Sequence, residues 1–341
     1  MKSIAIVILN WNGLGHLKQF LPSVIANSKV EGFTVDVVVA DNGSTDDSVQ
    51  WLNTLTESIK IICLDKNYGF TGGYNRALKQ INSDYYVILN SDVEVNNNWL
   101  EPMASFIEQN PNVAACMPKL NSYAAPKYFE YAGAAGGYID FLGYPFCRGR
   151  VLNIVEQDNG QYNEAKEIFW ATGACIMVRA TDFWSVGAFD EDFFAHMEEI
   201  DLCWRLKRSG KSIWCIPNAS VLHVGGGTLA VNNPQKAYFN HRNNLLMLLK
   251  NLSRQSIVPV MLVRFLLDYA SAFSYLITGK PKFTWSVIKA HSYFFGKCFS
   301  FVKKRRMFKH PKIKLYPTSI LLQFFVFKRK LFSTLPNKGY F

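Results

Sequence analysis

Acidic side chains follow directly after buried, strand-like stretches at two places in the chain. Asp41 follows the apolar run 35–40, and Asp92 follows the run 85–89 across a short polar turn. In an open α/β sheet, the carboxyl ends of parallel strands border the crevice that binds ligands. A carboxylate there can hold a cation or accept hydrogen bonds. The alternative is an ordinary turn or helix cap, for which Asp and Asn are common residues.

A second acidic cluster follows several aromatic residues in the stretch 193–205 and comprises Glu198, Glu199 and Asp201. A helix that begins near Glu198 has all three in its first turn, where the helix dipole favours negative charge. That is ordinary chemistry for a helix start. The aromatic neighbours, however, predict partial burial, which raises the pKa of a carboxyl group toward the value that a general base needs. His223, farther along, lies in a short apolar strand, where a lone histidine is usually a core residue. The glycines that follow it mark a loop of close approach and shift the balance toward a functional residue.

The elements that must position these side chains alternate between strand and helix in the first third of the chain. This alternation predicts an α/β fold of Rossmann type, a mostly parallel sheet with helices on both faces. Neither glycine-rich segment forms a dinucleotide or phosphate-loop motif after the first strand, so NAD and ATP sites are not expected. The run 168–178 is predicted as one buried strand and the runs 213–216 and 221–224 as two short ones. The region 121–160 is predicted to be irregular or hairpin structure that walls a substrate pocket.

Charge is distributed unevenly along the 341 residues, although the net charge is +11. From Lys236 onward there are 20 Lys and Arg residues against one acidic residue, Asp268. The seven cysteines form no Cys-x-x-Cys pair, which favours a reduced, cytosolic compartment. The amino terminus begins with a strand-like run and shows no signal-peptide pattern. The part of the chain before Lys236 is therefore acidic and the part after it basic, which predicts two surfaces of opposite charge.

Eight motifs stand in a fixed order, in the segments 8–13, 39–46, 67–75, 89–92, 171–177, 189–194 and 198–202 and at His223. Their order resembles that of the family 2 glycosyltransferases with the GT-A fold, especially the bacterial rhamnosyltransferase-like group that builds surface polysaccharides. The resemblance covers about residues 3 to 250. Each motif is weak alone, but the ordered set is specific.

The resemblance implies a role for each matched position. Asp41 would accept a hydrogen bond from the nucleotide base, and Asp92 would hold a divalent cation on the diphosphate of a nucleotide sugar. Asn90 stands where the Asp-x-Asp motif usually has its first acid, so Glu94 could compensate, and His223 would supply a further ligand. Carboxylate and imidazole suit Mn²⁺ or Mg²⁺. The other implied contacts to the nucleotide sugar are Asn10, Asn12, Asn67, Gly72, Gly73, Asn90, Thr172 and Gly173.

Glu199 aligns with the base position of the family, with Glu198 and Asp201 as alternatives. The implied reaction is inverting transfer of a sugar, with rhamnose the first candidate, from a dTDP- or UDP-linked donor to a polyprenyl-diphosphate-linked glycan. A sugar nucleotidyltransferase would need a basic glycine-rich loop after the first strand. Asn90, together with Glu in place of the commoner Asp at 199, leaves open a catalytically inactive GT-A-like glycan-binding or membrane scaffold protein.

A basic, amphipathic helical region is predicted at 253–341, after a catalytic domain at 1–252. The run 257–277 is long enough to span a membrane, but Arg264 and Asp268 near its centre disfavour spanning. Polar stripes opposite aromatic residues indicate helices that lie in the plane of an anionic membrane surface. We therefore expect peripheral binding to the inner face of the cell membrane. The alternatives are a bundle packed on the catalytic domain and nucleic-acid binding, which is not expected because no nucleic-acid module is recognised.

Overall fold

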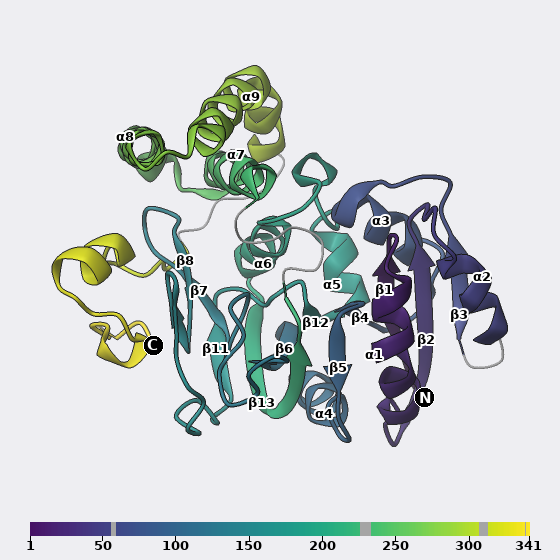
Figure 1. Ribbon diagram of the computed structural model, residues 1–341. Helices are drawn as coiled ribbons and strands as arrows, with labels where there is room; N and C mark the ends of the chain where they lie inside the picture. The colour runs from purple at the N-terminus through teal and green to yellow at the C-terminus, as the bar shows by residue number, and fades with distance from the viewer. Residues whose placement is uncertain (56–58, 226–232, 307–312, 338) are drawn as a thin grey trace.

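The computed structural model describes residues 1–55, 59–225, 233–306, 313–337 and 339–341. Within these ranges a nine-stranded sheet forms the centre of the molecule (Figure 1), in the order β11-β13-β6-β12-β4-β1-β2-β3, with β5 paired to β13. Its strands are β1 (Lys2–Asn10), β2 (Phe33–Asp41), β3 (Lys60–Cys63), β4 (Tyr85–Asn90), β5 (Val93–Val95), β6 (Val113–Ser122), β11 (Lys166–Ile168), β12 (Cys175–Arg179) and β13 (Ser212–His223).

The parallel half of the sheet comprises β4, β1, β2 and β3. Branched and other apolar side chains fill these strands, and residues 4–8 of β1 are fully buried, as expected for strands covered on both faces. The register pairs Asn10 with Asp41 and Leu9 with Asn90. The carboxyl ends of β1, β2 and β4 therefore meet at one edge, where the sequence predicts the site.

The other half of the sheet departs from the predicted mostly parallel arrangement. β12 is antiparallel to both β4 and β6, so the sheet is mixed. The predicted strand 168–178 is two strands, because residues 169–174 leave the sheet between β11 and β12. The two strands predicted at 213–216 and 221–224 are the single strand β13, which shifts register between Ile216 and Ser220. Apolar runs report burial but not strand direction or continuity, which is why the sequence could not reveal these features.

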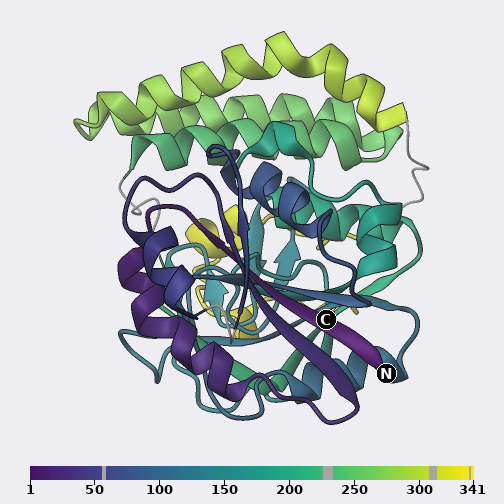
Figure 2. The ribbon, with the colours of Figure 1, turned by 90° about the vertical axis from the view of Figure 1, so that its right-hand side faces the viewer.

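Helices lie on both sides of the sheet, as predicted, and Figure 2 shows them flanking the crossing strands. The region 121–160, predicted to be irregular or hairpin structure, contains a small antiparallel sheet, in agreement with the hairpin alternative. The helices are α1 (Leu14–Asn27), α2 (Ser48–Leu52), α3 (Gly69–Leu78), α4 (Glu101–Gln109), α5 (Ala180–Ser185) and α6 (Glu198–Arg208), and the small sheet has β7 (Gly137–Ile139), β8 (Pro145–Cys147), β9 (Arg150–Val151) and β10 (Ile154–Val155).

Three long helices, α7 (Pro234–Asn251), α8 (Arg254–Ile277) and α9 (Pro281–Arg306), form a layer across one end of the sheet domain (Figures 1 and 2). The prediction of helices after residue 253 holds for α8 and α9. The segment 313–337 instead returns along the small sheet with only short helical turns. Its rings and those of the last residues pack on Tyr138 and Phe146, and the backbone N–H of Ile320 donates to buried Asp140. Tertiary aromatic packing thus overrides helix formation there.

Candidate active site

Asn10 and Asp41 form a buried polar pair where β1 and β2 end. The Asn10 side-chain amide donates to Asp41 Oδ2 at 2.9 Å, and the backbone N–H of Ser44 donates to Asp41 Oδ1 at 2.8 Å. The Asn10 Oδ1 atom is buried without a hydrogen-bond partner among the described residues. A buried amide oxygen without a donor is costly, so this edge is suited to a ligand that supplies one.

Asn12 shapes the neighbouring loop. It has a left-handed backbone with φ of 50°, and its side-chain oxygen accepts from the backbone N–H of Thr45 at 2.7 Å. The backbone N–H of Asn12 in turn donates to Ser44 Oγ at 2.9 Å. The loops after β1 and β2 are thereby tied together, so Asn12 shapes the site through the backbone.

The segment 67–75 builds the amino-terminal end of α3 against this edge. Asn67 Oδ1 accepts from the backbone N–H of Gly69 at 2.8 Å and from the amide of Asn42 at 3.1 Å. A methyl group on Gly73 would lie 2.8 Å from the Leu9 side chain, so glycine is needed where α3 packs on β1. Gly72 is similarly close to the Arg76 side chain. These residues position the helix, and Asn42 is a contributor that the sequence reasoning did not single out.

Asp92 and His223 meet as predicted, although 131 positions separate them. Asp92 Oδ1 lies 3.1 Å from His223 Nε2, and both side chains are buried. On the other side of the ring, Glu130 Oε1 lies 3.5 Å from Nδ1. Burial alone would lower the pKa of His223, but hydrogen bonding to Asp92 and the Glu130 carboxylate outweigh burial and raise this pKa to about 10. The pairing with His223 likewise outweighs burial and holds the pKa of Asp92 below its usual value.

Glu130 was not predicted, because it lies in the region 121–160, where no motif marks it. Its position resembles that of carboxylates that orient metal-binding histidines by contacting the second ring nitrogen. The backbone N–H of Ala132 also donates to the Glu130 carboxylate, at 2.5 Å, which fixes it against the histidine. Glu130 therefore belongs to the site as the residue that sets the orientation of His223.

The Asp92 and His223 pair fits a divalent cation in part. Because Oδ1 and Nε2 are 3.1 Å apart, one ion with bonds of about 2.1 Å can contact both. Asn90, at the position where the motif usually has an acid, has its amide 3.5 Å from the same ring nitrogen. Within the described ranges no group of three His, Cys, Asp or Glu side chains is arranged to hold a metal, so Glu94 is not gathered as a third ligand. A cation held by these two side chains would leave its remaining positions to a substrate and water.

Glu198 and Glu199 begin α6 and are the strongest candidates for a base. Glu198 is buried and Glu199 is partly buried, and each has one carboxylate oxygen that lacks a hydrogen-bond partner among the described residues. Burial raises the pKa of Glu199 to about 7. Burial, followed by repulsion from Glu199, raises the pKa of Glu198 well above its usual value. A carboxylate with a pKa near neutrality suits proton abstraction at physiological pH.

Thr172 and Gly173 connect this helix to the edge that carries Asn90. A methyl group on Gly173 would lie 3.8 Å from the Cβ of Glu199, and the backbone N–H of Asn90 donates to the carbonyl of Ala174 at 2.9 Å. The irregular segment between β11 and β12 therefore brings the end of β4 and the start of α6 together. Glycine at 173 instead makes room for the Phe70 ring, since a methyl group there would lie 3.2 Å from it.

Asp201 has a different role from its two neighbours. It is fully buried and ion-paired with Arg205 at 2.8 Å and Lys250 at 2.9 Å, and the amide of Asn251 donates to it at 2.7 Å. Although burial opposes it, the attraction of Arg205 and Lys250 holds the pKa of Asp201 far below its usual value. Such a carboxylate is a poor proton acceptor, so Asp201 is not carried forward as an alternative base.

The loop before α6 is held in a strained form by α7. Phe194, His196 and Met197 all have positive φ angles, between 64° and 70°, which are unfavourable for these residue types. The buried amide of Asn243 donates to three carbonyl oxygens of this loop, at 2.7 to 3.0 Å, and the neighbouring Arg242 donates to two. No motif in the sequence marks Asn243 or Arg242, so this role becomes visible only in the folded chain.

The fold and these side chains together define a glycosyltransferase of the GT-A type. Residues 5–187 match the model of glycosyl transferase family 2, and the chain belongs to that family, as the order of its motifs predicts. It is similar to N-acetylglucosaminyl-diphospho-decaprenol L-rhamnosyltransferase of Mycobacterium tuberculosis, with 26% identity over 238 residues, 64% of this chain and 75% of that protein. It is also similar to the rhamnosyltransferase WbbL of Escherichia coli, with 24% identity over 170 residues, 46% of this chain and 61% of that protein.

Solved structures show the same fold at low sequence identity. GalNAc-T7, crystallised with UDP, GalNAc and Mn²⁺, has a TM-score of 0.60 at 14% identity and covers 74% of this chain and 49% of its own. Residues 1–349 of Staphylococcus aureus TarS, in complex with UDP-GlcNAc, have a TM-score of 0.54 at 13% identity and cover 94% of this chain and 99% of that chain. These likenesses confirm the GT-A-like α/β fold with a mixed sheet.

Proposed function

We propose that this family 2 glycosyltransferase inverts the anomeric centre as it moves a sugar from a nucleoside diphosphate donor to a lipid-linked glycan. The observation that carries the proposal is the pair Glu198 and Glu199, carboxylates with raised pKa values beside the edge that carries Asp92 and His223. Rhamnose is the first candidate sugar and dTDP or UDP the first candidate nucleotide, because relatives named as rhamnosyltransferases are among the similar proteins.

The side chains of the site would supply the groups that a single displacement at the anomeric carbon requires. Glu199 takes the proton of the acceptor hydroxyl while the acceptor oxygen attacks the anomeric carbon of the sugar. The bond between that carbon and the diphosphate oxygen breaks, and its electron pair leaves with the nucleoside diphosphate. Asp41 and Asn10, at the ends of β1 and β2, bind the nucleotide base by hydrogen bonds.

A divalent cation, Mn²⁺ or Mg²⁺, would be held by Asp92 and His223 and would neutralise charge on the diphosphate. Glu130 would keep the imidazole of His223 in the orientation that this requires. Two solved structures of similar fold contain Mn²⁺, GalNAc-T7 and the Pyrobaculum calidifontis mannosyltransferase PcManGT, and are consistent with a cation in this role.

The helices α8 and α9 would place the enzyme on a membrane that presents such an acceptor. The acceptor of the mycobacterial relative is, by its name, a decaprenol-linked sugar diphosphate. Helix α8 is long and apolar enough to cross a membrane by length and composition, with a mean hydropathy of 1.5, and 28% of that window is buried. Arg264 and Asp268 point inward and pair with each other, so we propose that α8 lies along the surface of the inner leaflet with its apolar face in the lipid.

The test is a panel of nucleotide sugars incubated with the purified protein and a short-chain lipid-linked acceptor, with release of nucleoside diphosphate as the readout. We expect turnover with one donor, loss of turnover on removal of divalent cations, and a loss of at least 100-fold in Glu199→Gln. Full metal-dependent turnover in Asp92→Ala would contradict the metal assignment. An absence of turnover with every donor would favour the inactive scaffold that Asn90 suggests.

A further inference from the structure

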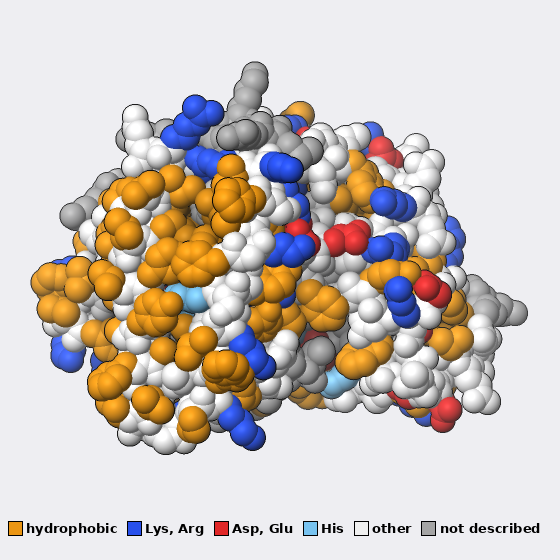
Figure 3. Space-filling view, turned by 90° about the horizontal axis from the view of Figure 1, so that it is seen from above, with side chains coloured by type: hydrophobic (Ala, Val, Ile, Leu, Met, Phe, Trp, Pro, Cys, Tyr) orange, Lys and Arg blue, Asp and Glu red, His pale blue; other side chains and the backbone are white. Residues whose placement is uncertain are grey.

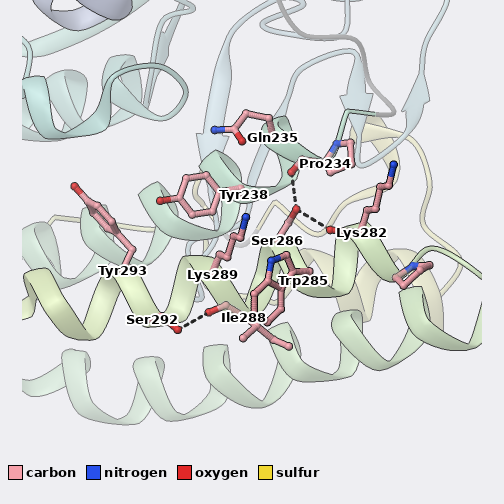
Figure 4. A pocket seen from close by; sticks show the side chains of 11 residues that line it. Pro234, Gln235, Tyr238, Lys282, Trp285, Ser286, Ile288, Lys289, Ser292 and Tyr293 are labelled. Atoms are coloured by element: carbon pink, nitrogen blue, oxygen red, sulfur yellow. Dashed lines mark hydrogen bonds between the residues drawn. The ribbon is translucent and has the colours of Figure 1, made fainter.

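A groove lies between α7 and α9, outside the site described above. Its volume is about 990 Å³, at the upper end of the range of roughly 300–1,000 Å³ for small-molecule sites. Figure 4 shows side chains of both helices around it, with the two lysines extending from α9 to the same side. The lining residues are Pro234, Gln235, Tyr238, Pro281, Lys282, Trp285, Ser286, Ile288, Lys289, Ser292 and Tyr293.

The composition of the lining indicates an amphiphilic anion. Lys282 and Lys289 are its charged members, and no carboxylate is among the described residues that line the groove. Aromatic and aliphatic side chains supply the rest of the wall, and the Lys289 ammonium lies 5.8 Å from the centre of the Trp285 ring. Two cations beside apolar rings match a ligand with a phosphate head and a hydrocarbon tail.

The groove opens onto the exposed apolar face of the helical layer. Trp285 and Ile288 line it and are themselves 55% and 39% exposed. Beyond them, Figure 3 shows a broad hydrophobic patch over α8 and α9. Exposed members of this patch include Leu262, Leu266, Phe273, Phe295 and Phe299. The hydrocarbon tail of a ligand bound in the groove can therefore extend onto this exposed apolar face.

Helix α7, which forms the opposite wall of the groove, contacts the loop that precedes the candidate base. Tyr238 lines the groove, and the ring of the next residue, Phe239, stacks on Phe194 with centroids 5.7 Å apart. Phe194 belongs to the strained loop that ends at Glu198, and its carbonyl accepts from the backbone N–H groups of Phe70 and Thr71 at the start of α3. Ser286 of α9 also donates to the carbonyl of Pro234 at 2.8 Å, which fixes the two walls together.

We propose that this groove binds the acceptor, taking its diphosphate at Lys282 and Lys289 and the first isoprenoid units against Trp285 and Ile288. The inference rests on the proposed function for the identity of the ligand. It assigns a use to the polar stripe of α9, Lys282, Ser286, Lys289 and Tyr293, whose four members line the groove beside α7. The anionic group would be held beside the loop that carries the base, so that the glycan next to it reaches the site.

Farnesyl diphosphate, a soluble isoprenoid diphosphate, tests the groove by titration calorimetry without any donor. We expect the double variant Lys282→Gln/Lys289→Gln to bind it at least tenfold more weakly than the wild type. The matched control, Lys297→Gln/Lys303→Gln, removes two charges from the same helix outside the groove lining and should bind within twofold of the wild type. Circular dichroism checks that each variant is folded, and Ser292→Trp, which narrows the groove without changing charge, should also weaken binding.

Equal affinity in the groove and control variants would overturn the proposal, as would equally tight binding of inorganic diphosphate and farnesyl diphosphate, which would indicate a simple anion site. In a transfer assay we expect the groove variant to raise the KM for the lipid-linked acceptor at least tenfold and to leave donor hydrolysis unchanged. Because calorimetry needs no turnover, absence of transfer in the wild type would count against the proposed function and leave the groove result to stand by itself.

Discussion

At the scale of single residues, the candidate site separates three neighbouring carboxylates by their surroundings. Asp201 is surrounded by Arg205, Lys250 and Asn251, so its negative charge is stabilised. Glu198 and Glu199, in the same helical turn, are buried and partly buried, respectively, without such partners, so their protonated forms are favoured. Among three acids within four positions, the pKa of one is thus lowered and the pKa values of two are raised. Only their tertiary contacts distinguish them.

The pH dependence of transfer follows from the pKa of Glu199. A general base acts in its deprotonated form, so kcat/KM should fall about tenfold per pH unit below pH 7 and level off above it. The residual activity of Glu199→Gln should lack this acidic limb, because a side-chain amide does not ionise in this pH range. The check is a profile of kcat/KM from pH 5 to 9.

Glu198→Gln serves as the matched comparison, since it changes the adjacent carboxylate by the same chemistry. It should retain the acidic limb if Glu199 is the base. If the limb disappeared in Glu198→Gln and persisted in Glu199→Gln, the two assignments would have to be exchanged.

At the scale of elements, α7 is the helix that connects the catalytic domain to the C-terminal layer. Toward the catalytic side, Asn243 and Arg242 hold the loop before α6, and Lys250 bridges Asp190 and Asp201 at 2.8 and 2.9 Å. On the other side, His241 lies 3.2 Å from Asp268 of α8. A boundary at residue 252 therefore separates elements that share buried polar contacts.

Replacement of Asn243 by Ala should affect both stability and catalysis. Three loop carbonyls lose the Asn243 amide, and among the described residues only that of Phe193 keeps a further donor such as Arg242, so we expect the free energy of unfolding to fall by about 3 kcal/mol. Because the loop sets the start of α6, kcat should fall more than tenfold with little change in the donor KM, and the acidic limb should shift. Urea unfolding and steady-state kinetics measure these effects.

Asn244→Ala is the control for this variant. The neighbouring amide donates to the carbonyl of Gly143, away from the loop, so its loss should lower stability by about 1 kcal/mol and leave kcat and the acidic limb unchanged. Equal kinetic effects in the two variants would show that Asn243 acts only through general stability.

At the scale of the whole molecule, the helices of the C-terminal layer are oriented differently from the prediction. The polar stripe of α8 was predicted to lie opposite lipid-facing side chains and to belong to the charged membrane face. Instead Arg264 and Asp268 are only 2% and 1% exposed, because Asp268 binds Arg264, His241 and His291 inside the layer. The apolar side chains of α8 face outward (Figure 3), so hydrophobic area rather than a basic stripe would drive membrane binding.

Membrane binding should therefore respond to changes in this face. Leu266→Glu/Phe273→Glu places two charges at positions that are 72% and 64% exposed and should reduce co-sedimentation with phosphatidylglycerol vesicles more than tenfold. Tyr128→Glu/Phe141→Glu changes two exposed rings outside this face and should leave binding unchanged. Undiminished binding of the first variant would refute the proposed role of the apolar face.

The sequence by itself determined the family, the order of its motifs and the strand ends that carry Asp41 and Asp92. Local patterns suffice for these features because turn residues and apolar runs record burial and strand ends directly. It also identified His223 and the acidic start of α6 through the order of the family's motifs.

Only the tertiary structure decided strand direction, the inward orientation of the α8 stripe and the partners of each acid. Glu130 contacts His223 from 93 positions away, and Asn243 holds a loop about 50 positions before it. Such contacts are made by distant segments that folding brings together, and no local period encodes them. The same reason explains why three adjacent acids could not be ranked until Lys250 and Asn251 were seen beside Asp201.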